Sequence, residues 1–159
     1  MINASEVRDL FDYDHESGKL LRKRTSVGGH RRQTRRQCGD GYITIKVKKA
    51  RHLEHRLVWA WHHGSWPTRV IDHINRDKTD NRIENLRDVP NWVNLHNRGA
   101  NKNNRSGHRG VRFNSKTGKW RVEIRSKNGS HRATASTYDE AIKTWNVLFG
   151  RVSSNMGPL

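Results

Sequence analysis

The sequence predicts an α+β protein made of two small modules. In residues 70–98, two short apolar runs separated by a polar loop are followed by a helical pattern. In residues 107–150, three alternating runs precede one amphipathic helix. The chain has 159 residues, of which 31% are hydrophobic, so each module can bury only a small core.

The charge of the chain points to its partner. Lys and Arg number 32 against 15 Asp and Glu, which gives a net charge of +17, and the basic residues are spread through every segment. Such a field attracts a polyanion, so a nucleic acid is the predicted partner. A basic ribosome-associated surface, or one that is merely solvated, is the alternative.

The single cysteine, Cys38, excludes an internal disulfide and any multi-cysteine zinc cluster, and is compatible with a reducing cytosol. No apolar stretch approaches the roughly 20 residues of a membrane span, and the N-terminus lacks the apolar core of a secretory signal. We therefore expect a cytoplasmic protein without a membrane partner.

The first 39 residues predict a helix and a basic arm. Asn3 and Glu6 have the spacing of a capping box, which favours a short helix over residues 4–11, and a turn and a strand at 19–23 follow. Residues 22–40 are rich in Arg, Lys and Gly and nearly devoid of apolar side chains. Four arginines there are candidate phosphate contacts, with a solvated loop as the alternative: Arg31, Arg32, Arg35 and Arg36.

Residues 40–69 predict a hairpin and a helix. Residues 42–47 alternate as in a half-buried strand, and the chain then turns back toward 52–54. A helix over 55–63 is ended by Gly64. Three histidines in it are ligand candidates by residue type alone, although we favour surface or core roles for them: His55, His62 and His63.

The motif with most chemistry is the Asp72-His73 dipeptide at the end of the strand predicted at 70–74. It places a carboxylate that can bind a metal beside an imidazole that can act as a general base. Neighbours on a strand face opposite ways, so we expect a frayed strand end to bring both to one phosphate. After a second strand at 83–89, a helix beginning at Pro90 could bring Asn94 to Asp72.

Three runs resemble the His-Asn-His (HNH) homing-type endonucleases of bacteriophages, whose ββα-metal fold often has Asn as its last motif residue: Asp72-His73-Ile74-Asn75, Asn81-Arg82-Ile83-Glu84-Asn85-Leu86-Arg87 and Asn94-Leu95-His96-Asn97-Arg98. The resemblance implies hydrolysis of phosphodiester bonds to a 5′-phosphate and a 3′-hydroxyl. It implies that Asp72 and Asn94 hold one Mg²⁺ or Mn²⁺, that His73 is the general base, and that Asn85 keeps His73 in register and tautomer. It also suggests a phage-infected bacterial cell as the setting. Without cysteine pairs we expect no structural zinc, and His96 is predicted to be a phosphate contact or surface residue.

The second module predicts strands near 109–113, 119–125 and 131–137 and a helix over 138–149. By alternation, five apolar residues should face that helix: Val111, Phe113, Trp120, Val122 and Ile124. The opposite, open face would carry Arg112, Arg121, Glu123 and Arg125. A sheet face with arginines suits the major groove, where Arg can contact guanine with two hydrogen bonds.

Two runs in this module resemble the AP2 DNA-binding domain, a three-stranded sheet backed by one helix: Gly107-His108-Arg109-Gly110-Val111-Arg112 and Gly118-Lys119-Trp120-Arg121-Val122-Glu123-Ile124-Arg125. The resemblance covers about residues 105–150. With the charge pattern it makes eight residues DNA-binding candidates: Arg98, Arg109, Arg112, Lys119, Trp120, Arg121, Glu123 and Arg125. A small basic α+β domain that binds RNA or protein is the alternative.

Together these patterns predict a metal-dependent endonuclease acting on double-stranded DNA. The predicted segments are an N-terminal helix and arm (1–39), a nuclease domain (40–98), a linker (99–106), an AP2-like domain (107–150) and a tail (151–159). A catalytically silent DNA-binding regulator and an RNA nuclease are the competing hypotheses. One site per chain nicks one strand unless two chains act together, so monomer and homodimer both stay open.

Overall fold

The computed structural model describes residues 2–24, 34–100 and 103–154. The chain divides into two compact units, residues 1–89 and 90–159. Each unit has its own cluster of buried apolar side chains. The mixed α and β content agrees with the predicted fold class.

The first unit begins with helix α1 (Ala4–Leu10), followed by the antiparallel hairpin of β1 (Phe11–Asp14) and β2 (Lys19–Arg22). The capping box is present, since the Asn3 side chain accepts from Glu6 N and the Glu6 side chain accepts from Asn3 N. The predicted helix was one residue too long, because Phe11 is extended and starts β1. Strand β1 was not predicted: Phe11 lies four residues after Val7, which is also the spacing of a helix face.

The rest of the first unit holds a three-stranded sheet, a helix and a second hairpin. The sheet order is β3 (Arg35–Gln37), β4 (Ile43–Val47) and β5 (Ala50–Leu53). Helix α2 (Glu54–His63) ends at Gly64, whose φ of 70° is left-handed as the sequence predicts. Strand β6 (Val70–His73) pairs with β7 (Leu86–Val89), and the 3-10 turn η1 (Ile83–Asn85) occupies the start of the longer strand that the sequence predicted.

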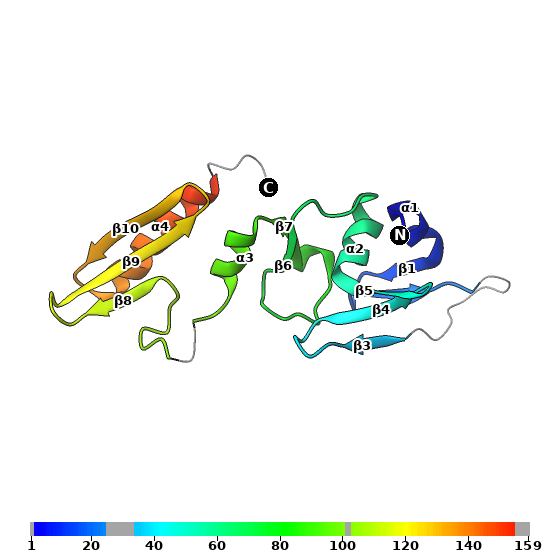
Figure 1. Cartoon of the computed structure of the whole chain (residues 1–159), viewed down its shortest axis with the longest axis horizontal. Helices are drawn as coiled ribbons and strands as arrows, with labels where there is room; N and C mark the ends of the chain where they lie inside the picture. The colour runs from blue at the N-terminus through cyan, green and yellow to red at the C-terminus, as the bar shows by residue number, and fades with distance from the viewer. Residues whose placement is uncertain (1, 25–33, 101–102, 155–159) are drawn as a thin grey trace. The chain divides into compact units, whose positions relative to one another are not determined.

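One apolar core joins these elements. It contains side chains from α1, β1, β2, β4, α2 and the β6–β7 hairpin, among them Phe11, Leu20, Ile45, Leu57 and Ile71. Helix α2 packs directly against α1 (Figure 1). The N-terminal helix and hairpin are therefore part of the unit that carries Asp72 and His73.

The second unit contains α3 (Asn91–Asn97), β8 (Val111–Asn114), β9 (Lys119–Ser126), β10 (Gly129–Ala135) and α4 (Tyr138–Ser154). The three strands form an antiparallel sheet in the order β10-β9-β8, and α4 packs along it (Figure 1). The expected sheet with one helix is present, and α4 continues past the predicted end at Phe149.

Helix α3 packs on α4 within the second unit. Trp92 lies 6.0 Å from Phe149, and His96 lies 6.1 Å from Trp145, measured between ring centroids. His96 Nε2 also hydrogen-bonds the backbone oxygen of Arg125 at 3.0 Å. The helix expected to complete the ββα arrangement thus makes these contacts with the C-terminal sheet and helix.

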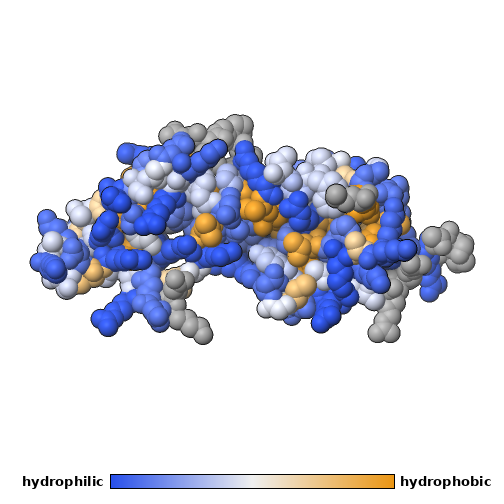
Figure 2. Space-filling view, in the orientation of Figure 1, coloured by the Kyte–Doolittle hydropathy of each residue, from blue (hydrophilic) through white to orange (hydrophobic). Residues whose placement is uncertain are grey.

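The visible surface is mainly hydrophilic, with hydrophobic side chains in smaller groups (Figure 2). None of the helices in the described part of the chain combines the length and the apolar character needed to cross a bilayer.

Candidate functional site

The β6–β7 hairpin fixes the two residues of the Asp-His dipeptide. Asp72 pairs with Arg87 and His73 with Leu86 in the strand register, and both side chains are buried. The expectation of a frayed strand end is wrong, because Ile74 N still donates to Asn85 O at 2.9 Å. The ladder therefore continues past His73, and the two side chains have different environments.

Asp72 makes an ion pair across the hairpin. Its Oδ2 accepts from Arg87 Nε at 2.9 Å and from Nη2 at 2.7 Å. Arg87 thus fixes the orientation of the Asp72 carboxylate, and cation binding by Asp72 stays a prediction. Arg87 was not predicted as the partner of Asp72, although counting across the hairpin places it opposite Asp72.

The His73 ring packs against Asn81, His55 and Tyr42. Its Nε2 lies 3.0 Å from Asn81 Oδ1. The His55 ring packs edge-on against it with centroids 5.1 Å apart, and the Tyr42 ring lies 5.9 Å away. These contacts hold the imidazole in one orientation, as a general base requires.

His55 is a core histidine that supports His73. Only 4% of its surface is exposed, and burial, followed by the nearby charge of His73, lowers its pKa to about 3. It is therefore neutral near pH 7. The other two histidines of α2 have packing contacts: the His62 ring lies 5.6 Å from Tyr13, and His63 stacks on Trp59 at 3.9 Å.

Asn85 binds the loop that follows His73, and its influence on the tautomer of His73 stays a prediction. Its Oδ1 accepts from Asn75 N at 2.9 Å and its Nδ2 donates to Asp80 O at 2.8 Å, so both ends of its amide bind the 74–82 loop. Asn85 therefore keeps the loop in register, and Asn81 makes the hydrogen bond to His73 Nε2. Either asparagine could hydrogen-bond to His73 by its chemistry. The fold of the loop decides that Asn81 makes this bond.

The same loop is held by its own polar groups. Arg82 makes a two-bond contact with Asp80, at 2.8 Å from Nε and 2.7 Å from Nη2. The hydrogen bond from Arg82 lowers the pKa of Asp80 to about 2. Asn75 Nδ2 also donates to Asp80 at 2.8 Å, so this carboxylate is a structural group of the loop.

The residues proposed for a metal lie in different units. Asp72 belongs to the first, whereas Asn94 lies on α3 in the second, so their meeting stays a prediction. Within residues 2–24, 34–100 and 103–154, no three His, Cys, Asp or Glu side chains gather as a metal cluster. An Asp oxygen and an Asn oxygen are nonetheless the hard donors that Mg²⁺ or Mn²⁺ prefers, with water and substrate as further ligands.

The four arginines of the basic arm have different positions. Arg31 and Arg32 lie outside the described residues. Arg36 is exposed on β3 and remains a candidate phosphate contact. Arg35 instead forms an ion pair inside the first unit. Its Nη2 lies 2.6 Å from Oε2 of Glu54, a side chain with no exposed surface. The prediction of Arg35 as a DNA contact is therefore replaced by a structural role.

The open face of the C-terminal sheet carries charged side chains as predicted. Arg112 pairs with Arg121 in the register, and both are exposed. Glu123 lies among three guanidinium groups, at 3.9 Å from Arg121 and 3.4 Å from Arg125 and from Arg132. This carboxylate spaces the arginines and leaves a net positive surface.

One of the two aromatic residues predicted to face the helix of this module departs from the predicted arrangement. Val111, Val122 and Ile124 are fully buried as expected, but Phe113 is 55% exposed. Trp120, named as a DNA candidate, contacts Phe113 at 5.2 Å and Tyr138 at 4.9 Å. Trp120 packs against the core cluster of the second unit as expected, and Phe113 is its strand partner. Contact between Trp120 and DNA stays a prediction.

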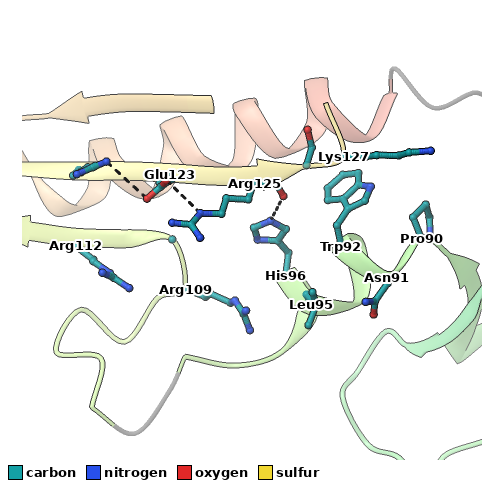
Figure 3. Close-up of a pocket in the computed structure, with 13 residues that line it drawn as sticks. Pro90, Asn91, Trp92, Leu95, His96, Arg109, Arg112, Glu123, Arg125 and Lys127 are labelled. Carbon is teal, nitrogen blue, oxygen red and sulfur yellow. Dashed lines mark hydrogen bonds and ion pairs between the residues drawn. The ribbon is translucent and has the colours of Figure 1, made fainter. Parts of the chain in front are cut away.

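A groove of about 770 Å³ lies between α3 and this sheet, inside the second unit. Figure 3 shows Arg112 and Arg125 on the sheet and Arg109 on the loop before β8, while Trp92 and His96 come from α3, and all five line the groove. His96 is held by Arg125 O, which accounts for its orientation. The remaining candidates, Arg98 and Lys119, are exposed.

Residues 52–96 match a family model described as HNH endonuclease. The matched segment runs from β5 to α3 and includes the β6–β7 hairpin, though it spans less than a third of the chain. The match indicates nucleic-acid endonuclease activity, with DNA as the suggested substrate. No curated protein and no solved structure gave a match.

Proposed function

We propose that this chain is a divalent-metal-dependent DNA endonuclease of the homing type. The observation that carries the proposal is the Asp72-His73 pair, fixed in a hairpin that falls inside the HNH match. The net charge of +17 fits a polyanionic substrate. The groups needed for phosphodiester hydrolysis are an oriented base and an oxygen donor for a cation, and both are present in the first unit.

In this proposal His73 takes a proton from the attacking water. The water oxygen then bonds to phosphorus as the bond to the 3′ oxygen breaks, which leaves a 5′-phosphate and a 3′-hydroxyl. Asp72 and Asn94 would hold one Mg²⁺ or Mn²⁺, which when bound neutralises phosphate charge and stabilises the leaving oxygen. Arg87 holds the Asp72 carboxylate in place for this role.

The second unit would find the target. Arg112, Arg121 and Arg125 lie on an exposed face whose geometry suits base contacts in the major groove, as in the AP2 domains that this segment resembles. Arg36 and Arg98 would bind phosphates and add affinity without sequence preference. Double-stranded DNA is the proposed partner, bound in the cytoplasm of an infected bacterial cell.

The test is conversion of supercoiled plasmid to nicked and linear forms with Mg²⁺ or Mn²⁺, compared with EDTA. We expect His73→Ala to lower the rate by about 10²–10⁴-fold, because it removes the base. Asp72→Ala should also stop cutting, with DNA affinity kept within a few-fold. His63→Ala, at an exposed position on α2, is the matched histidine control and should cut normally. Cutting that survives both His73→Ala and EDTA would reject the proposal.

A silent DNA-binding regulator is the second candidate. The ion pair between Asp72 and Arg87 favours it, because an engaged carboxylate is a weaker ligand than one exposed to solvent. Tight binding to DNA without conversion of any plasmid, in either metal, would select this function.

A further inference from the structure

A chain of buried polar groups leads away from His73 to a carboxylate on α2. His73 Nε2 lies 3.0 Å from Asn81 Oδ1, and Asn81 Nδ2 lies 3.1 Å from Glu54 Oε2. All three side chains are buried, with exposed fractions of 3%, 1% and 0% for His73, Asn81 and Glu54. Polar groups are retained in such a place only when they are paired, so this chain is a built feature of the core.

Glu54 stands at an apolar position of its helix. Leu57 and Val58, three and four residues further on, belong to the same helix surface and are fully buried. A carboxylate here is tolerated because Arg35 and Asn81 bind its Oε2, while Oε1 accepts from Leu20 N at 3.4 Å. Glu54 is thus tied to three different parts of the first unit.

These contacts determine which way the Asn81 amide faces. A carboxylate only accepts hydrogen bonds, so the Asn81 NH₂ must point to Glu54 and its carbonyl oxygen must point to His73. That oxygen can only accept, so His73 Nε2 must carry the proton. In the neutral ring, the lone pair that can take up a proton is therefore on Nδ1.

The backbone around Asn81 is also fixed. The Tyr13 hydroxyl donates to Asn81 O at 3.4 Å and accepts from Ile83 N at 2.9 Å. Gly18 in the β1–β2 turn lies so close that a Cβ there would be 2.6 Å from the carbonyl carbon of Asn81. The N-terminal hairpin thus holds the loop from outside while Glu54 holds the amide from inside.

We propose that Glu54 and Asn81 are positioning residues for the reaction, which set the tautomer and orientation of His73. The inference rests on the proposed nuclease function for its consequence, but its physical content, the Nε2-protonated ring, can be tested without cutting. Neither residue touches the substrate in this scheme. Arg35 acts one step further out, by holding Glu54.

The first test is the protonation pattern of the His73 ring, measured by long-range ¹H–¹⁵N correlation in the full-length protein above the pH at which the ring is charged. We expect Nε2–H in the wild type and a mixture of both tautomers in Asn81→Ala. Glu54→Gln should keep the wild-type pattern, since the glutamine oxygen can still accept from Asn81. Nδ1–H as the main tautomer of the wild type would overturn the inference.

The second test is kinetic. Asn81→Ala should lower kcat for plasmid cutting by about 10–100-fold, the range typical for groups that orient a ligand or base, with a smaller change in KM. Glu54→Gln should stay within a few-fold of the wild type. Equal kcat in Asn81→Ala and the wild type would contradict the positioning role.

Glu54→Ala could fail to fold because it leaves Arg35 unpaired, so a paired change keeps the test decisive. The double variant Glu54→Leu with Arg35→Leu removes both charges and replaces them with apolar groups, which buried pairs commonly tolerate. We expect it to fold and to show the mixed tautomers of Asn81→Ala. A folded double variant with the wild-type tautomer and kcat would reject Glu54 as a positioning residue. A wild type that never cuts but shows Nε2–H would instead reject only the nuclease.

Discussion

The pairing of Arg35 with Glu54 makes a strong prediction, because the sequence alone places Arg35 among DNA contacts. The change is Arg35→Ala, with Arg36→Ala as the matched control on the same strand. Arg35 Nη2 is 2.6 Å from a carboxylate with no exposed surface, whereas Arg36 is exposed. One substitution should therefore act on stability and the other on DNA binding.

The magnitude follows from what Glu54 loses. Breaking a buried ion pair by removing one partner costs about 3–5 kcal/mol, since the other charge is left in a dry site. Here the Arg35 side chain is 29% exposed and Glu54 keeps its bonds from Asn81 and Leu20. Water can enter the vacated space, so we expect about 2–3 kcal/mol for Arg35→Ala. Arg36→Ala should change the free energy of unfolding by no more than about 0.5 kcal/mol.

The assay is urea unfolding of the full chain, followed by the NMR amide signals of α2 and, separately, of α4. Arg35→Ala should lower the urea midpoint of α2 and leave that of α4 unchanged, because α4 belongs to the other unit. DNA affinity is then measured over a salt series. Arg36→Ala should reduce the log–log slope by about one, the value for one lost phosphate contact, and Arg35→Ala should not.

The reasoning is refuted if Arg35→Ala unfolds at the wild-type urea concentration and its salt slope falls by about one. Arg35 would then be a phosphate contact, and the carboxylate of Glu54 would not need it.

Three further predictions concern other parts of the chain. His55 has a pKa of about 3 in the folded protein against the ordinary value of 6.5 for histidine, so the unfolded chain binds more protons than the folded chain between these pH values. Stability should therefore fall as the pH drops through this window, by up to about 1.4 kcal/mol per pH unit. The urea midpoint of His55→Phe, measured at pH 5 and 7, should depend less on pH. Gly18→Ala should destabilise the first unit by at least about 2 kcal/mol more than Gly64→Ala in thermal or urea unfolding, because both have left-handed φ angles but a Cβ at Gly18 would be 2.4 Å from Arg82 N and one at Gly64 would meet nothing closer than 3.9 Å. Arg125→Ala should relax the preference at one base pair by about 1–3 kcal/mol in binding to a selected duplex, and unchanged discrimination would count against the sheet as the reader.

Local patterns in the sequence predicted many of the elements well. The capping box at Asn3, the left-handed Gly64 and the three strands after residue 107 were all found from neighbouring residues, because capping, turn geometry and strand alternation act over a few positions. Strand β1 was missed because Val7 and Phe11 fit both a helix and a strand. The start of β7 was placed too early because the turn η1 begins with Ile83, an apolar residue that also fits a strand.

Some residues of the candidate site could be predicted from the sequence, and others could not. The Asp72-His73 pair could be found from sequence because the two residues are adjacent and their chemistry is distinctive. Their partners could not: Arg87 is 15 residues from Asp72, and Glu54 is 27 residues from Asn81. Glu54 lay outside the helix predicted at 55–63, so no local pattern marked it as a buried position.

The sequence by itself determined the mixed α and β class, much of the secondary structure and the candidate residues for the chemistry, because these depend on local pattern and residue type. Only the tertiary structure decided which asparagine orients His73, which arginine serves the core, and that α3 packs with the C-terminal sheet and helix. The physical reason is that a buried polar group must find a partner wherever the fold brings one, and that choice is made by packing between distant segments.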